Sequence, residues 1–249
     1  TKEELQKLQV KYAWMGLGLG YVSGFDADEK NVNMNIYILM QGGLTLGAKD
    51  YYLNNDAATV AIREAYKTYL SKMFQLYGFS ADEAAKKASA VFLHETTLAT
   101  FSKSRTELRD PQANYNKMTL AEFKENYPNI PLEALANAEG IKSENLKEMI
   151  IGQPAFFAGY DKVAAAECAG TLKALMEWDI INSSASYLSD EIREARFEFF
   201  GKTMSGRKED YPLWKRATAQ VEAQLGVRLD CSFFSSFVPS FLPLSLLPP

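Results

Sequence analysis

The sequence predicts a mainly α-helical fold: a multi-helix lobe with a small β-hairpin near its N-terminus. Apolar residues recur every three or four positions between Asp56 and Gly78, which is the period of one helix face. Ser80 followed by Glu83 forms a capping box, a signature of a helix start. Residues 33–40, NMNIYILM, alternate loosely as a β-strand does.

The hairpin is expected between Tyr12 and Met40. The turn-rich run DADEKN comes directly before the alternating segment, so it is the natural place for the chain to reverse. The first half of this region is punctuated by four glycines, Gly16, Gly18, Gly20 and Gly24.

Two long helices follow the loop QGGLTLGAKDYYL. Asp56 is expected to cap the first, which ends at Gly78. The second helix begins after Ser80, and the small side chains of this helix predict close packing against another helix. One face of this second helix is formed by Ala84, Ala88, Val91, Glu95, Leu98 and Ser102.

Shorter helices are expected in the rest of the chain. Pro111 disfavours a helix at Asp110, so RDPQANYN is a loop, and Thr119 with Glu122 caps a short helix ending before Pro128. Prolines in first-turn positions and glycine stops then place the others. These helices are predicted over residues 131–139, 154–163, 172–187, 190–204 and 212–225.

Composition restricts the class of protein. A hydrophobic content of 47% in 249 residues is enough for a substantial core. The formal net charge of −4 gives no reason to expect nucleic acid or an anionic membrane as a partner. Cys168 and Cys231 are far apart in sequence and suggest neither a disulfide framework nor a thiolate metal site.

The chain is expected to consist of a helical domain, residues 1–229, and a tail, residues 230–249. It begins at Thr1 with a charged run that lacks the apolar core of a secretory signal, so we expect a piece of a longer protein. The tail has no charge after Asp230, and its prolines prevent a continuous helix or membrane span. Because it breaks every local rule that the preceding sequence follows, we interpret it as foreign to the domain.

His94 and Glu95 begin like the zinc-binding motif HExxH, but position i+4 is Leu98 and His94 is the chain's single histidine. We therefore interpret His94 as an ordinary helix residue. A Ser or Cys triad would have to use the same histidine. Glu95, Glu107 and Asp110 are expected to be solvated surface carboxylates. The sequence accordingly predicts no catalytic, cofactor-binding or metal-binding residue in this chain.

Seven short motifs nevertheless resemble one family. In chain order they are Gly42-Gly43-Leu44, Asp50-Tyr51-Tyr52, Arg109-Asp110-Pro111, Tyr115-Asn116-Lys117-Met118-Thr119-Leu120, Gly152-Gln153-Pro154, Tyr187-Leu188-Ser189 and Trp214-Lys215-Arg216. Between about Gly16 and Leu229 the chain is similar to the N-terminal helical region of the neprilysin and endothelin-converting-enzyme family of zinc metalloendopeptidases. One motif alone would be weak, whereas seven in order are specific.

The resemblance implies a two-lobed enzyme that hydrolyses small peptides, in which this lobe encloses the substrate chamber. The implied partners are a C-terminal catalytic domain missing from this chain and small peptide substrates, with no membrane contact by this segment. Zinc would be bound in that missing domain and not here, so the chain alone is expected to be inactive. The family also suggests the cell envelope or the extracellular space as the location.

Two positions depart from the family pattern. Ala217 stands where animal members often have Cys, which argues against a disulfide-linked animal ectodomain, and the tail replaces the family's continuation after Leu229. Two alternatives remain open: a free-standing helical binding or scaffold module, and an enzyme of another class whose site the sequence does not reveal.

Overall fold

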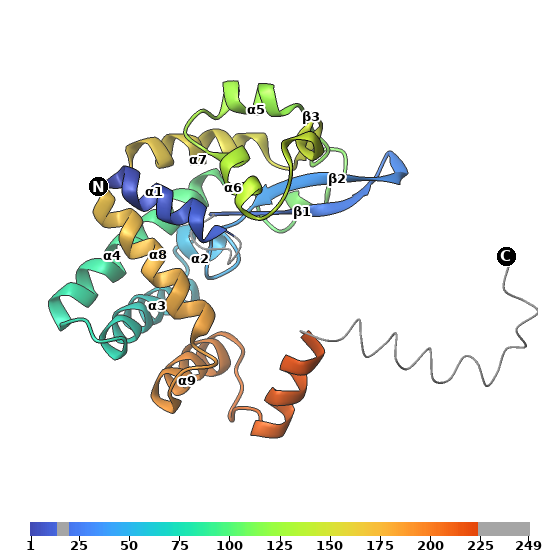
Figure 1. The fold of residues 1–249 in the computed structure, drawn as a ribbon. Coiled ribbons are helices and arrows are strands. Elements are labelled where there is room, and N and C mark those ends of the chain that lie inside the picture. The colour runs from blue at the N-terminus through green and yellow to red at the C-terminus, as the bar shows by residue number, and fades with distance from the viewer. Residues whose placement is uncertain (14–19, 224–249) are drawn as a thin grey trace, which may run out of the picture. The chain divides into compact units, whose positions relative to one another are not determined.

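A computed structural model describes residues 1–13 and 20–223 of the chain. It divides into two units, Thr1–Met204 and a second unit of which residues 205–223 are described. The tail beginning at residue 230 lies outside the described residues. In the first unit, helices surround a small sheet (Figure 1). The predicted fold class, mainly α with a small β component near the N-terminus, is confirmed.

The sheet contains the predicted hairpin. Strand β1 (Tyr21–Asp28) pairs antiparallel with β2 (Asn31–Gln41), from Tyr21 opposite Gln41 to Asp28 opposite Asn31. The far end of the hairpin projects beyond the helices (Figure 1).

Two strands that the sequence did not reveal complete the sheet, β3 (Lys117–Met118) and β4 (Met149–Ile151). The strand order is β1-β2-β4-β3, with β4 parallel to β2 and antiparallel to β3. Segments of two and three residues are too short to display a period of two, which explains why the pattern did not indicate them.

The long helices form where their caps predicted. Helix α3 (Ala57–Leu76) is capped by Asp56, whose side chain accepts from the Thr59 amide. Helix α4 (Ala81–Phe101) and helix α5 (Leu120–Asn126) both have complete capping boxes, built on Ser80 and Thr119. The sequence signals therefore act locally, as expected of caps that satisfy amides left free in the first turn.

The remaining helices agree with expectation except at their ends. The helix predicted over residues 190–204 is α9 (Asp190–Arg196), continued by a π-helix, η4 (Phe197–Met204). The helix predicted over residues 212–225 is described as far as residue 223 and is helical over residues 213–223. The others are α6 (Leu132–Ala138), α7 (Pro154–Ala166) and α8 (Ala169–Ser184). Elements without a sequence-based prediction are α1 (Lys2–Lys11), η2 (Glu107–Arg109) and η3 (Ser143–Leu146). Helix α2 (Asp50–Leu53) lies in the segment QGGLTLGAKDYYL, so the prediction of a loop was wrong at the end of that segment, where a single helical turn is too short to show a period.

Two hydrophobic clusters make up the core of the first unit. One joins α3, α4, α8 and α9 around Trp178 and Tyr66, and the other packs the sheet against α5, α6 and α7 around Phe157 and Leu39. Leu44, in the segment between β2 and α2, contacts both clusters. Among the described residues, no helix is long and apolar enough to cross a membrane.

Candidate functional site

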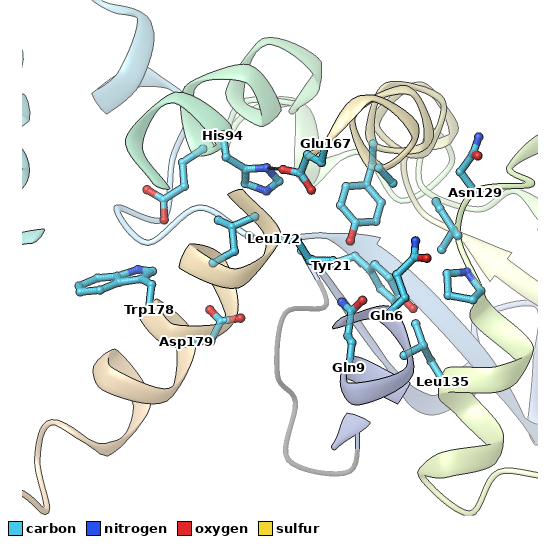
Figure 2. Close-up of a pocket in the computed structure, with 18 of the residues that line it drawn as sticks. Gln6, Gln9, Tyr21, His94, Asn129, Leu135, Glu167, Leu172, Trp178 and Asp179 are labelled. Atoms are coloured by element: carbon cyan, nitrogen blue, oxygen red, sulfur yellow. Dashed lines mark ion pairs between the residues drawn. The ribbon is translucent and has the colours of Figure 1, made fainter. Parts of the chain in front are cut away.

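A cavity of about 260 Å³ lies in the first unit, between α1, α4, α7, α8 and the start of β1 (Figure 2). Two groups of lining residues come from helices far apart in sequence: His94 and Glu95 from α4, and Trp178 and Asp179 from α8. Further polar lining side chains are Gln6, Gln9, Asn129, Tyr21, Tyr160 and Glu167. The cavity therefore combines titratable groups with aromatic walls, as binding sites for small ligands commonly do.

Helix α1 is anchored beside the cavity by its first residue. The ammonium group of Lys2 donates hydrogen bonds to the carbonyls of Ala164 and Ala165, at 2.7 and 2.9 Å. These carbonyls belong to the last turn of α7, where a cation compensates the unpaired acceptors and the negative end of the helix dipole. The contact places the polar face of α1, with Gln6 and Gln9, along one wall.

Glu95 is buried, with 3% of its surface exposed, so the expectation that it is a solvated surface carboxylate was wrong. The hydroxyl of Thr45 donates to its Oε1 at 2.6 Å, and the hydroxyls of Tyr52 and Tyr66 both donate to its Oε2 at 2.8 Å. Burial raises the pKa of Glu95 to about 7, against the lowering effect of the three hydrogen bonds. A carboxyl group that titrates near neutrality is chemically able to accept and release a proton.

His94 is half-buried and its side chain pairs with Glu167, the residue that caps the C-terminus of α7 (Figure 2). Of the side chain alone, 7% is exposed. The contact joins α4 to the end of α7 in the wall of the cavity. His94 is thus a helix residue with a specific structural partner.

These residues do not fit a zinc ion. Leu98, at the position of the second motif histidine, is fully buried in the apolar core, and Glu95 is directed at three hydroxyl groups while His94 faces Glu167. Zinc requires at least three nitrogen, sulfur or carboxylate ligands converging on one point. Across residues 1–13 and 20–223, no group of three or more His, Cys, Asp or Glu is arranged to hold a metal ion.

Glu107 and Asp110 lie apart from the cavity, on the loop after α4. Glu107 accepts from the Ser104 amide at 2.7 Å and pairs with Lys49. The side chain of Ser104, its amide and Lys49 together lower the pKa of the Glu107 carboxyl to about 2. Asp110 accepts from the amides of Gln112 and Ala113. Both residues organise the exposed turn in which they lie, and the structure brings neither of them to Glu95.

Several motif residues turn out to fix the backbone around the sheet. The side chain of Gln153 is buried, accepts from the Gln41 amide at 2.8 Å and donates to Asn114 at 3.0 Å. Asn116 donates to the carbonyl of Ile151 at 3.0 Å. Gly43 has a φ of +72°, and a Cβ there would lie 2.9 Å from the backbone of Gly20. These motifs therefore correspond to positions that the fold constrains.

Four partners in this site were not predicted from the sequence: Thr45, Tyr66, Trp178 and Glu167. They come from four segments, and a single sequence carries no signal that joins them. One signal was available for Glu95, because it shares the α4 face with Ala88, Val91 and Leu98. A glutamate in the apolar stripe of an amphipathic helix is expected to be buried and hydrogen-bonded.

A family model described as Peptidase family M13 matches residues 1–240. Endothelin-converting enzyme 1 of Bos taurus is 26% identical over 216 residues, which are 86% of this chain and 28% of the relative. The human enzyme is 25% identical over 235 residues, which are 93% of this chain and 30% of the relative. The chain thus spans less than a third of the length of these relatives.

Solved structures share the fold. Zinc metalloprotease Zmp1 of Mycobacterium tuberculosis, in complex with an inhibitor, superposes with a TM-score of 0.86 at 24% identity, covering 95% of this chain and 36% of that one. PepO from Lactobacillus rhamnosis superposes with a TM-score of 0.76 at 16% identity, covering 98% of this chain and 38% of that one.

Proposed function

The chain belongs to peptidase family M13, and from this premise we propose that it is the N-terminal, non-catalytic lobe of a zinc metalloendopeptidase that hydrolyses small peptides. In this proposal the lobe encloses the substrate chamber, and a catalytic domain outside this chain binds the zinc. One observation carries the proposal: the family model matches residues 1–240, while the chain covers only 28% and 30% of two relatives that are themselves endothelin-converting enzymes.

The arrangement of side chains supports a role in enclosure. The motifs shared with the family set turns, caps and sheet contacts, as the contacts of Gln153, Asn116 and Gly43 illustrate. Such positions maintain the backbone conformation of the lobe. A lobe that encloses a chamber needs a defined conformation more than it needs reactive side chains. The chemistry proposed for the whole enzyme, attack of a zinc-activated water on a peptide carbonyl with a glutamate as general base, needs none of them.

The test is to read the genomic DNA beyond the Leu229 codon in all three frames. We expect one frame to encode an HExxH segment followed by a downstream glutamate. The protein expressed from that complete gene should hold zinc and cleave short peptides, and should leave folded proteins intact. If no frame encodes such a segment, the proposal fails and a free-standing helical binding module becomes the better interpretation.

A further inference from the structure

The cavity between α1, α4, α7 and α8 is lined by more carboxyl groups than cationic groups. Its carboxyl groups are those of Glu95, Glu167 and Asp179, against the imidazole of His94 and the ammonium group of Lys2. The Lys2 ammonium is already engaged, because it donates to two carbonyls in the last turn of α7. The lining is therefore acidic, and a positively charged occupant would balance it.

The hydrogen bonds around Glu95 are arranged for its ionised form. The indole N–H of Trp178 donates to the Thr45 hydroxyl at 3.2 Å, so the proton of that hydroxyl is left for Glu95. The Leu46 amide donates to the Tyr52 hydroxyl at 3.1 Å, which directs the proton of Tyr52 to Glu95 as well. Burial opposes the charge and raises the pKa of Glu95 to about 7. A cation in the cavity would favour the carboxylate for which these donors are arranged.

Hydrogen-bonding groups without a protein partner line the same cavity. The Tyr160 hydroxyl, the side-chain amide of Gln6 and Oε2 of Glu167 make no hydrogen bond within residues 1–13 and 20–223. Oε1 of Glu167 is the atom that contacts His94. Burial, and then the negative charges of Glu167 and Asp179, raise the pKa of Tyr160. The free acceptors therefore lie in a region of negative potential, where a charged N–H donor is favoured.

Aromatic rings form the other part of the lining. Trp178 comes from α8, and the rings of Tyr21 and Tyr160 contact each other with their centroids 5.9 Å apart. In Figure 2, α8 with Trp178 and Asp179 lies on one side of the cavity and α1 with Gln6 on the other. Aromatic faces attract ammonium and guanidinium groups within about 6 Å. The combination of carboxylates, neutral acceptors and rings is typical of sites that recognise organic cations.

Two other classes of ligand do not fit this lining. In the described part of the chain, no group of three or more His, Cys, Asp or Glu is arranged to hold a metal ion. An anion would be repelled by the three carboxyl groups. The volume of about 260 Å³ is just below the range of about 300–1,000 Å³ that is usual for drug-sized ligands, so the occupant is small.

We propose that this cavity binds a small organic cation, a primary ammonium or guanidinium group on a short apolar stem. The cationic end lies between Glu167 and Asp179 and donates to their carboxylates, to the Tyr160 hydroxyl and to the carbonyl of the Gln6 side chain. The stem contacts Leu172, an apolar residue of the lining. The inference concerns this chain alone and does not depend on a zinc-binding domain.

Calorimetric titration of the whole chain with benzylamine and with benzylguanidine tests the proposal. Benzyl alcohol and phenylacetate carry the same ring with a neutral and a negative end. At pH 8 Glu95 is ionised, because its pKa is about 7, while an alkyl ammonium is still protonated. We expect one site per chain for each cation, about 10-fold or more tighter than for benzyl alcohol, and no binding of phenylacetate.

Two variants locate the site. Asp179→Asn keeps the size of the side chain and removes its charge, so it should weaken benzylamine binding about 10-fold and leave benzyl alcohol unaffected. Tyr160→Phe removes a hydroxyl that no described residue uses and should weaken benzylamine about 3-fold. Glu177→Gln is the matched control. Glu177 lies on the same helix as Asp179 but pairs with Lys87 outside the cavity, so its substitution should not change the affinity.

The proposal is overturned if neither cation binds saturably, or if benzyl alcohol or phenylacetate binds as tightly as benzylamine. It is also overturned if Asp179→Asn retains the native affinity, or if Glu177→Gln weakens binding as much as Asp179→Asn does, since the cation would then bind elsewhere on the surface. If circular dichroism shows that Asp179→Asn does not fold, Tyr160→Phe decides the question. Native affinity for benzylamine in Tyr160→Phe would place the cation outside the cavity and overturn the proposal.

Discussion

Asp28 shows how a single side chain positions the hairpin. Only 4% of the side chain is exposed. Its carboxylate accepts from the ammonium group of Lys117 at 2.9 Å, from the hydroxyl of Tyr115 at 2.8 Å and from the Lys30 amide at 3.0 Å. The first two partners belong to the motif YNKMTL, so Asp28 connects the turn of the hairpin to the start of β3 and the residues just before it, about ninety residues further along the chain.

Substitution of Asp28 by Asn tests this contact. The Lys117 ammonium, the Tyr115 hydroxyl and the Lys30 amide lower the pKa of Asp28 from 3.8 to about 2, so the contact stabilises the fold above pH 3.8 and is lost as the pH falls to about 2. Asp28→Asn should lower the urea midpoint at neutral pH and remove this part of the acid dependence. Asp26→Asn, at an exposed position of the same strand, is the control and should leave both unchanged. If the stability of Asp28→Asn fell with acid as much as that of the native chain, the assignment would be contradicted.

At the scale of elements, glycines set how closely helices approach. Gly159 of α7 is buried, and a Cβ there would lie 2.2 Å from the ring of Phe101, the last residue of α4. Gly170 of α8 is in a different situation, because the nearest heavy atom to its Cβ position is the Cys168 sulfur at 3.8 Å. The first glycine is required by packing and the second is not.

Gly159→Ala should therefore destabilise the chain by about 1–3 kcal/mol, since the methyl group forces α7 and α4 apart. Gly170→Ala should be neutral or stabilising by up to about 1 kcal/mol, because alanine has the better helix propensity and meets no clash. Chemical denaturation of both variants beside the native chain measures the difference. Equal stabilities of the two variants would show that α7 can move away from Phe101 at little cost.

Elements could be predicted from the sequence where the signal is local. Capping boxes at Ser80 and Thr119, and the cap at Asp56, mark helix starts because the cap and its partner are three residues apart. The short strands β3 and β4 were missed because they exist only through pairing with β2 and with each other. The cavity was missed for the same reason, since its walls come from segments as distant as Gln6 and Trp178.

At the scale of the whole chain, we expect the purified protein to carry no stoichiometric zinc and to cleave no peptide. His94 is its single histidine and is paired with Glu167, while Cys168 is an exposed free thiol and the other cysteine, Cys231, lies outside the described residues. A catalytic zinc site needs three protein ligands in one place. Elemental analysis and a chelator-controlled peptide assay check this. One tightly held zinc per chain with chelator-sensitive cleavage would contradict it.

The isolated chain is also expected to self-associate. The hairpin carries four exposed apolar side chains, Val22, Phe25, Val32 and Met34, between 47 and 76% exposed. Strand β1 is moreover an edge of the sheet, and it contains neither lysine nor proline to discourage pairing with another strand. Exposed apolar side chains beside an unpaired strand edge favour contact between two copies of the chain, because that contact removes the apolar surface and the strand edge from water.

Sedimentation of the native chain over a range of concentrations should therefore show dimers or larger species. In the double variant Val32→Thr, Met34→Thr the equilibrium should shift toward monomer. Threonine retains the β propensity of this part of β2, so the hairpin itself should persist. Leu93→Thr, an exposed apolar residue on α4 away from the hairpin, is the matched control and should leave association unchanged. A native chain that remains monomeric at high concentration, or association that the control weakens as much as the double variant does, would show that the hairpin is not the contact between copies.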